Sequence, residues 1–599
     1  MNDQPTTLWQ ILKAQAAIYP EHLALSSLAS PPLTYQHLWE LVDQTQRQLR
    51  QWGICREQRV VMVAPANSAV TLSLSFAIAS SAICIPLNPN FTQSEFLTYL
   101  QQLHPQALVI VSNCADAAAK AAVQLDLPII LATPLPNRTG WFQLQETTEI
   151  KTQSVLSPPS PEDIAFVFQT SGSTAQPKFV PVTHKGLCYS SSNVKDCLQL
   201  GTDDICLNVL PLFHVHGLVT NGVVPLIAGN LICLYGNFEA SVFWQWLNQS
   251  QATWFSVPPT IHQAILQAAP KITPKLPLQF IRSGSAALSP HVKKELTELL
   301  NVPFLEAYGM SEALTITNTP LPPSVDKPGS VGKVVNGNVA IINESGEPLP
   351  PQQVGEIAVR GNHVTPGYLD NLEANPTAFI NGWFRTGDIG YLDAEGDLFL
   401  VGRSKEMINR GGEKISPQEV DAVLLKHPQV LEVATFGISH PSLGEDIAAA
   451  VVLKENDVSL QHLRDYLFDH LAPYKIPSQI LIVESIPRGT TGKIIRQELA
   501  AYFSDKLTPI YATPRTETEV KIAQICSEVL GIETIGLDDN FFALGGHSLL
   551  ATQVISRLRQ AFGIELSFLS FFATPTVAGL SQEIEKSYGV KEDYEEGEI

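Results

Sequence analysis

The sequence predicts a multi-domain α/β protein. A large N-terminal domain with parallel-rich sheets and helices precedes a small mobile α/β subdomain and an all-α, four-helix domain. In the first 170 residues short β-rich runs alternate with helix-like segments, which is typical of parallel strands covered by helices. Short strands with turn signals begin near residue 355, and amphipathic helices begin after residue 515. With 599 residues, 45% of them apolar, the chain is long enough for several buried cores.

The large domain is expected over residues 1–402. Its predicted strands lie at 60–63, 83–87, 107–111, 129–131 and 164–168, and its predicted helices at 68–79, 94–103 and 115–125. No charged residue occurs between Arg59 and Glu95, but prolines and asparagines interrupt this stretch. It is therefore predicted to be a buried strand, helix and strand, and not a membrane span.

The remaining chain divides into four parts. Residues 403–500 are expected to form the small subdomain, with elements at 416–425, 430–438 and 460–470. Residues 501–514 carry Pro and Thr without an amphipathic period, which indicates a linker. Residues 515–586 are expected to hold the helical domain, with helices at 517–530, 548–562 and 577–587. The acidic tail, 587–599, is expected to be disordered.

The net charge limits the classes of partner that we expect, and the cysteine usage indicates the cellular compartment. The 38 basic and 58 acidic side chains give a net charge of −20, which repels phosphate backbones and anionic lipid and argues against nucleic-acid and membrane partners. The last 99 residues hold 15 acidic and 7 basic side chains, so this end is a separate acidic module. Eight cysteines without a CxxC pair, and a start without a signal-peptide pattern, predict a cytoplasmic protein.

A Ser/Thr/Gly-rich loop follows the predicted strand at 164–168. Loop N–H groups, hydroxyls and a mobile lysine can wrap a triphosphate, although the loop lacks the Walker A pattern. Taken alone, the same composition is also typical of a flexible surface loop. The candidate nucleotide-binding residues are Thr170, Ser171, Gly172, Ser173, Thr174 and Lys178.

Four motifs occur in an order that resembles the acyl-adenylate-forming superfamily, with its acyl-CoA synthetases and nonribosomal-peptide adenylation domains. They lie at 170–178, 308–312, 383–388 and 487–493. The resemblance covers about residues 1–500, and further runs at 257–262, 279–288 and 409–414 are most similar to oxalate–CoA ligases. It implies attack of a carboxylate on the α-phosphorus of ATP, with Mg²⁺ as the cofactor that neutralises phosphate charge.

The resemblance assigns roles to several residues in the large domain. Glu312 corresponds to the catalytic Mg²⁺ ligand, although an acidic side chain at a helix start is the alternative interpretation. Tyr308, Gly309 and Ser311 belong to the nucleotide-binding motif, and Ser311 replaces the usual Thr but keeps the hydroxyl. Asp388 resembles the ribose-binding aspartate. In the phosphate loop Ala175 replaces the usual Gly, which removes no hydrogen-bond donor.

The resemblance also assigns roles to three basic residues of the small subdomain. Arg403 resembles the arginine that helps to hold the nucleotide, and Lys405 lies at the hinge position, where a surface lysine is a serious alternative. Lys493 resembles the catalytic lysine that contacts both the carboxylate and the phosphate. It lies on a glycine-flanked loop.

The segment Asp539–Leu550 resembles the signature of phosphopantetheine carrier domains. Ser548 follows two glycines and a histidine at the start of a predicted helix, where an added phosphate would face the positive helix end. The alternative is an ordinary serine N-cap. The resemblance implies 4'-phosphopantetheine on Ser548, attached by a phosphopantetheinyl transferase, and a downstream synthase or acyl-accepting enzyme as partner. Val554, Leu558, Phe562 and Leu566 are then expected to form core.

The substrate is expected to be a small carboxylic acid, short or polar. The stretch 211–218 resembles acyl-CoA synthetases, and His214 occupies the place where amino-acid-activating relatives have an Asp, which argues against an α-amino acid. The candidate pocket residues are His214, His262, Arg282, Gly284 and Ser285. Each of these is also consistent with a structural role. A metal site at His214 and His216 lacks a third ligand.

Three functions remain open at this point. The first is an enzyme that adenylates an acid and loads it onto its own carrier domain, for biosynthesis of the nonribosomal-peptide or polyketide type. The second is an acyl-CoA ligase that uses free coenzyme A as acceptor. The third is an inactive scaffold that recruits partners through the carrier domain, against which the intact Glu312, Asp388 and Lys493 speak.

Overall fold

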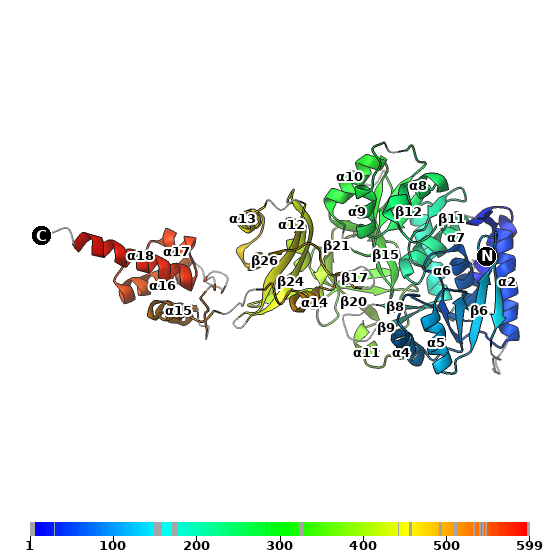
Figure 1. Ribbon diagram of the computed structural model, residues 1–599, viewed down its shortest axis with the longest axis horizontal. Coiled ribbons are helices and arrows are strands. Elements are labelled where there is room, and N and C mark those ends of the chain that lie inside the picture. The colour runs from blue at the N-terminus through cyan, green and yellow to red at the C-terminus, as the bar shows by residue number, and fades with distance from the viewer. Residues whose placement is uncertain are drawn as a thin grey trace. The chain divides into compact units, whose positions relative to one another are not determined.

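The structure is a computed structural model. It describes residues 6–28, 30–147, 159–170, 178–272, 274–286, 288–322, 327–440, 443–454, 458–489, 494–507, 512–530, 534–537, 539, 541, 544 and 548–595. The chain forms two compact units, Met1–Leu400 and Val401–Ile599 (Figure 1). All eight cysteines are free thiols. Among the described residues, no helix is long and apolar enough to cross a membrane.

The first sheet of the large unit has seven strands in the order β7-β6-β5-β3-β4-β8-β9. Its central strands are parallel, and β7 and β9 pair antiparallel at the two edges. The strands are β3 Arg59–Val63, β4 Ile83–Leu87, β5 Ala107–Val111, β6 Ile129–Pro134, β7 Phe142–Glu146, β8 Ile164–Thr170 and β9 Lys178–Thr183.

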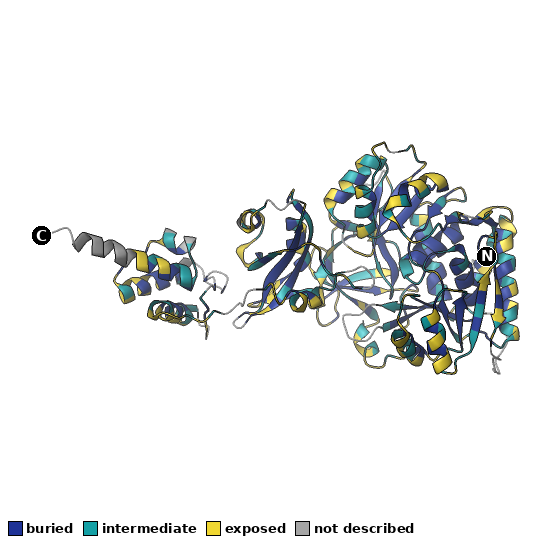
Figure 2. Cartoon of the chain, in the orientation of Figure 1, coloured by how far each residue is buried: buried dark blue, intermediate teal, exposed yellow. Residues whose placement is uncertain are grey.

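Helices cover both faces of this sheet. Val60 and Met62 of β3 pack in one core with α3 (Ala69–Ala79), whereas Val61 and Val63 pack in another with α4 and α5. Because alternate side chains of a strand point to opposite faces, a strand that is buried throughout needs a helical layer on each side. Figure 2 shows these strands as buried and the outer helix faces as exposed.

The second sheet has fourteen strands and an internal change of direction. Strands β1 and β10 to β14 are parallel, whereas β14 to β18, β20 and β21 form an antiparallel half. Its strands are β1 Leu23–Ser26, β2 Leu33–Thr34, β10 Ile205–Leu207, β11 Leu231–Cys233, β12 Trp254–Val257, β13 Phe280–Ser283, β14 Phe304–Met310, β15 Leu314–Asn318, β16 Ser330–Val334, β17 Asn338–Ile342, β18 Gly355–Arg360, β19 Phe379–Ile380, β20 Trp383–Leu392 and β21 Asp397–Arg403.

The helices of the large unit are mostly short and amphipathic. They are α1 Leu8–Ile18, α2 Tyr35–Gln51, α3 Ala69–Ala79, α4 Gln93–Leu103, α5 Asp116–Gln124, α6 His184–Cys197, the π-helix η1 His216–Val223, α7 Val224–Ala228, α8 Ala240–Ser250, α9 Pro259–Gln267, α10 Pro290–Leu300 and α11 Asn375–Ala378. Side-chain N-caps explain several starts, since Ser68 accepts from Thr71 N and Thr92 forms a capping box with Glu95.

The second unit begins with a small α/β subdomain. A sheet in the order β23-β22-β25-β24, with β26 beside β25, has one core on each face. Its elements are η2 Ser404–Glu406, β22 Ile408–Arg410, β23 Glu413–Ile415, α12 Pro417–Leu424, β24 Val430–His440, β25 Gly444–Leu453, α13 Leu460–His470, η3 Pro473–Lys475, β26 Gln479–Ile482 and α14 Arg496–Tyr502.

Four helices complete the chain, namely α15 Glu517–Leu530, α16 Ser548–Phe562, α17 Phe568–Ala573 and α18 Val577–Glu595. Val554, Leu558 and Leu566 are buried in their common core, and Phe562 packs against it, as expected. Helix α18 continues to Glu595, past the expected domain boundary at residue 586. The multi-domain α/β fold with a four-helix C-terminal domain is otherwise confirmed.

Candidate adenylation site

The strand pair β8–β9 forms the base of the candidate phosphate loop. Thr170 is the register partner of Lys178, and the Thr170 hydroxyl donates to the Lys178 carbonyl oxygen at 3.3 Å. The hairpin therefore brings the two ends of the loop together. The predicted residues Ser171, Gly172, Ser173 and Thr174 lie outside the described residues.

The carboxyl end of β14 holds the second motif, where the parallel half of the large sheet meets the antiparallel half. Gly309 lies against β15 so closely that a Cβ atom would be 2.1 Å from the Leu314 carbonyl oxygen, so only glycine fits there. Ser311 and Glu312 follow in the turn between the two strands, and Glu312 is 7% exposed. A buried carboxylate beside the end of a parallel strand is suited to a hard cation such as Mg²⁺.

A tyrosine that sequence reasoning missed connects this carboxylate to the phosphate loop. The Tyr368 hydroxyl donates to Glu312 Oε1 at 3.0 Å, and Lys178 Nζ lies 4.3 Å from the centre of the Tyr368 ring. Burial, followed by the adjacent Glu312 charge, raises the pKa of Tyr368, so the hydroxyl remains a donor at neutral pH. No charge or motif signal in the sequence marks this residue.

Asp388 lies in the middle of β20 and is buried. Its Oδ2 accepts a hydrogen bond from the Tyr308 hydroxyl at 2.7 Å, and its N–H donates to the Thr386 hydroxyl oxygen at 3.1 Å. The structure thus brings together Tyr308 and Asp388, two predicted nucleotide-binding residues that lie 80 positions apart. A carboxylate held in this way can accept from a ribose diol.

The predicted basic residues beyond Leu400 belong to the second unit. Arg403 ends β21, Lys405 lies in η2, and both side chains are exposed. Gln497 Nε2 donates to the Lys405 carbonyl oxygen at 3.2 Å. Lys493 lies outside the described residues, as does the side chain of Ser548, the first residue of α16.

The candidate substrate residue Arg282 lies on β13 and is 3% exposed. Arg282 Nε donates to Asn318 Oδ1 at 2.8 Å, and Nη1 donates to the Ser256 hydroxyl oxygen at 3.1 Å. Burial lowers the pKa of Arg282 to about 10, so the guanidinium stays charged at neutral pH. Both of these acceptors are neutral, and among the described residues Arg282 has no carboxylate partner, which makes burial of its charge costly.

His216 and Arg282 both contact the Ser256 hydroxyl oxygen. The sequence had favoured the neighbouring His214 as a pocket residue. His216 Nε2 lies 2.8 Å from the Ser256 hydroxyl oxygen, and Nδ1 lies 3.0 Å from that of Ser285, which has a φ of 74°. His216 is the first residue of the π-helix η1, and such helices are frequent at functional sites. A Cβ atom on Gly284 would lie 3.7 Å from the His216 ring and 4.0 Å from Arg282 Nη1, so both side chains converge on Gly284.

The other two predicted histidines have different surroundings. The His214 ring packs on Phe213 at 4.5 Å, and its backbone carbonyl accepts from Leu218 N at 2.9 Å, just before η1. His262 is fully buried and its Nε2 lies 3.1 Å from the Arg282 carbonyl oxygen. Burial lowers the pKa of His262 to about 4, so it is neutral. His262 therefore supports the strand that carries Arg282.

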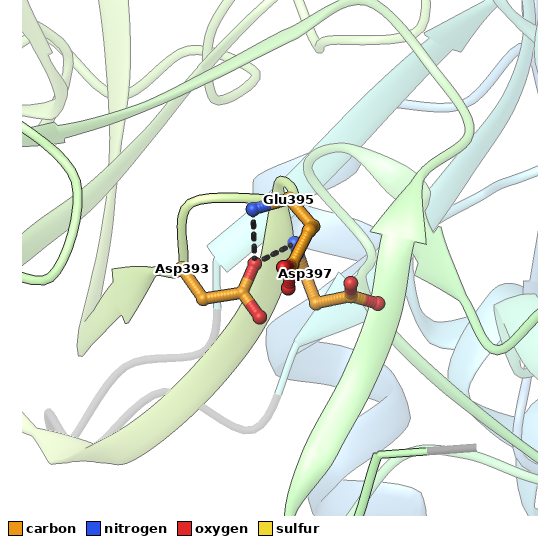
Figure 3. Close-up of side chains that lie close together, drawn as sticks. All are labelled: Asp393, Glu395 and Asp397. Atoms are coloured by element: carbon orange, nitrogen blue, oxygen red, sulfur yellow. Dashed lines mark hydrogen bonds between the residues drawn. The ribbon is translucent and has the colours of Figure 1, made fainter. Parts of the chain in front are cut away.

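Asp393, Glu395 and Asp397 gather at the turn between β20 and β21 (Figure 3). Lys327 contacts all three carboxylates, with Nζ 3.0 Å from Asp397 Oδ2. Asp393 Oδ1 also accepts from Glu395 N at 3.0 Å and from Asp397 N at 2.8 Å. The lysine ammonium lowers the pKa of Asp393. This cluster is an internal ion network that closes a turn, and we assign no metal to it.

Comparison with known proteins agrees with this geometry. Residues 12–369 match the AMP-binding enzyme family, which covers more than half of the chain. The chain belongs to the AMP-binding enzyme family. Residues 419–493 match the C-terminal domain of AMP-binding enzymes, and residues 520–584 match the phosphopantetheine attachment site family. The protein is thus an adenylate-forming ligase with a thiolation domain.

Three relatives show how the parts of this AMP-binding enzyme compare. It is 38% identical to an oxalate–CoA ligase of Arabidopsis thaliana over 84% of this chain and 99% of that protein. It is 28% identical to a dimodular nonribosomal peptide synthase of Bacillus subtilis over 98% of this chain and 24% of that protein. The fold matches O-succinylbenzoate coenzyme A synthetase of Bacillus subtilis, in complex with ATP and magnesium ion, with a TM-score of 0.71 and 27% identity over 82% and 99% of the two chains.

The residues present fit ATP and Mg²⁺. Glu312 supplies a buried carboxylate, Lys178 supplies a cation at the end of the phosphate loop, and Asp388 supplies a fixed acceptor. A hard cation, a phosphate and a ribose diol are each chemically matched by one of these groups. The carrier domain implies modification by a phosphopantetheinyl transferase.

Proposed function

We propose that this enzyme activates a short or polar carboxylic acid, not an α-amino acid, as an acyl-adenylate and transfers it to the phosphopantetheine thiol on its own Ser548. The observation that carries the proposal is that one chain holds both an adenylating region and a carrier domain. A thiol tethered through the 501–514 linker is present at an effective concentration of about the millimolar range when the linker spans the sites. We assign the product to biosynthesis of the nonribosomal-peptide or polyketide type, with a downstream synthase as acceptor.

In this proposal each polar group of the site has one task. Bound Mg²⁺ supplies charge neutralisation at the phosphates, and Glu312 is its protein ligand. Lys178 and the phosphate loop bind the triphosphate, and Tyr308 fixes Asp388 to receive the ribose. Lys493 contacts the reacting carboxylate and phosphate, where a positioned cation stabilises the charge that develops in the transition state.

The residues around Gly284 favour an acid with a second anionic or strongly polar group. Arg282 is a buried cation whose hydrogen bonds run to the neutral side chains of Asn318 and Ser256, and His216 faces the same point. A second carboxylate there would gain a charge-assisted hydrogen bond and would offset the cost of burying the guanidinium. The two neutral acceptors, Asn318 and Ser256, would hold the Arg282 guanidinium in place.

ATP–pyrophosphate exchange with a panel of acids tests whether the enzyme prefers acids that carry a second polar group. We expect short dicarboxylic or similarly polar acids to exceed α-amino acids and unsubstituted fatty acids in kcat/KM. Arg282→Gln is expected to lower kcat/KM about thirtyfold for the polar acids, the worth of roughly 2 kcal/mol for a charged hydrogen bond, while short neutral acids change less than threefold. Arg282→Lys keeps the charge and is the matched variant. Equal losses for all acids would contradict a role in acid selection.

The alternative function is ligation to free coenzyme A. It is favoured by the similarity of the first five hundred residues to proteins named as CoA ligases. If coenzyme A is the acceptor, the acyl thioester accumulates in solution and Ser548 stays unacylated. The two acceptors are distinguished by where the acyl group is found, since the adenylation step is common to both.

A further inference from the structure

Tyr368 lies in a segment that is fixed to both sides of the candidate metal and phosphate site. The Leu369 N–H donates to the Phe179 carbonyl oxygen at 2.9 Å, next to Lys178 on β9. The Thr365 N–H donates to the Glu312 carbonyl oxygen at 2.7 Å. One short stretch of backbone therefore joins the strand that follows the phosphate loop to the turn that carries Glu312.

The side chain of Asn375 holds the backbone of Tyr368 in turn. The Tyr368 N–H donates to Asn375 Oδ1 at 2.7 Å, and Asn375 Nδ2 donates to the Tyr368 carbonyl oxygen at 2.9 Å. Tyr368 itself is 8% exposed. A buried ring on a backbone clamped at both its donor and its acceptor has little freedom to move, so the positions of its hydroxyl and its face are well defined.

The two ends of this side chain contact groups of opposite charge. The hydroxyl donates to Glu312 Oε1 at 3.0 Å, and the ring face lies 4.3 Å from Lys178 Nζ. A hydrogen bond to the carboxylate of a metal ligand orients the group toward the cation. A ring face attracts an ammonium and thereby restricts where the positive charge lies.

We propose that Tyr368 is a positioning residue for Mg²⁺–ATP, which orients Glu312 through its hydroxyl and holds Lys178 against its ring. The inference rests on the proposed roles of Lys178 and Glu312. The new element is that one side chain, Tyr368, positions both Lys178 and Glu312. Its hydroxyl and its ring therefore make separable contributions to the binding of Mg²⁺–ATP. The hydroxyl affects the dependence on Mg²⁺, and the ring affects the binding of the nucleotide itself.

Calorimetric titration of ATP into the full-length protein, at a series of Mg²⁺ concentrations and without acid substrate, tests this inference. Tyr368→Phe keeps the ring and removes the hydroxyl. We expect a rise of about tenfold in the Mg²⁺ concentration that gives half of the maximal increase in ATP affinity. A loss of this size is typical when the hydrogen-bond partner of a metal ligand is removed. The affinity for ATP without Mg²⁺ is expected to stay within twofold of the wild type.

Tyr368→Leu removes both contacts. We expect it to raise the half-maximal Mg²⁺ concentration in the same way and to weaken ATP binding without Mg²⁺ several-fold, because Lys178 loses its ring. Tyr99→Phe is the matched control, since Tyr99 packs on Phe91 and Phe179 in an aromatic cluster. Its titrations are expected to match the wild type. Thermal unfolding of each variant establishes that the comparison is made on folded protein.

Glu312→Gln separates failure of this inference from failure of the proposed site. If Glu312→Gln loses the Mg²⁺ dependence and Tyr368→Phe retains wild-type values, the site stands and the role of Tyr368 is overturned. If Glu312→Gln itself shows wild-type Mg²⁺ dependence, the assignment of Glu312 is wrong and the inference falls with it. A tenfold shift in Tyr368→Phe together with a larger one in Glu312→Gln supports both.

Discussion

The Tyr308 hydroxyl donates a 2.7 Å hydrogen bond to Oδ2 of Asp388. Tyr308 belongs to β14 and Asp388 to β20, two strands of the large sheet that are separated in its order by β15, β16 and β21. Both residues are buried. The contact therefore ties the end of the parallel half of the sheet to the antiparallel half, at the place where we expect the nucleotide.

Removing this hydroxyl is expected to weaken nucleotide binding. Tyr308→Phe removes the hydroxyl that donates to Asp388 Oδ2, so the carboxylate is held less firmly in the orientation that suits a ribose diol. We expect KM for ATP to rise about tenfold, which corresponds to roughly 1.4 kcal/mol, with KM for the acid unchanged in pyrophosphate exchange. Tyr391→Phe, on the same strand as Asp388, is the control. A lower kcat with an unchanged KM for ATP would argue against a role in ribose binding.

Three buried histidines predict that acid destabilises the protein. Burial lowers the pKa of His184, His262 and His363 to about 4, below the ordinary value of 6.5. Between these two values the unfolded chain binds protons that the folded chain does not, so the free energy of unfolding falls as the pH is lowered from 6.5 to 4. Each group contributes a slope of up to about 1.4 kcal/mol per pH unit.

His262→Gln tests this pH dependence. Glutamine can still donate to the Arg282 carbonyl oxygen but does not titrate. Urea unfolding at pH 7 and pH 5 is expected to give a smaller difference in unfolding free energy for this variant than for the wild type, by roughly 1 to 2 kcal/mol. His22→Gln, at an exposed position, serves as the control. A pH dependence identical to the wild type would show that His262 does not titrate in this range.

Lys493→Ala is expected to separate the two half-reactions. Loss of one positioned charge typically lowers the rate about 10²–10³-fold, so adenylate formation should nearly disappear. Thiolation of a preformed acyl-adenylate does not need this lysine and is expected to remain largely intact. Lys454→Ala, an exposed lysine of the same subdomain, controls for general loss of charge. Equal loss of both half-reactions would rule out the specific role.

The fold was most predictable where periodicity is strong. Strands β4 and β5 and helices α13, α15 and α16 have the predicted bounds, because short apolar runs and amphipathic periods determine these elements locally. The strands from β10 to β17 carry weaker local signals and join one sheet through partners far away in the chain. That sheet was not predictable from local patterns.

The candidate site was also predictable only in part, where local sequence signals are strong. The family resemblance implied the roles of Glu312 and Asp388, and the composition of the Ser/Thr/Gly-rich loop suggested Lys178. Tyr368 and His216 were missed, because a tyrosine or a histidine gains its role only from what the fold places beside it. His262 was named as a pocket residue, but its ring packs between Phe255 and Phe304 and its nitrogen faces a backbone carbonyl.

The central claim is that the acyl group ends on the carrier domain of the same chain. The direct measurement is the intact mass of the pantetheinylated protein after incubation with ATP, Mg²⁺, coenzyme A and the best acid of the panel. Ser548→Ala is the matched variant, which should retain pyrophosphate exchange but accept neither pantetheine nor acyl group. We predict that the wild-type mass rises by one acyl group located on the Ser548 pantetheine. Acyl-CoA in solution with an unacylated carrier, or no consumption of ATP, would contradict the account.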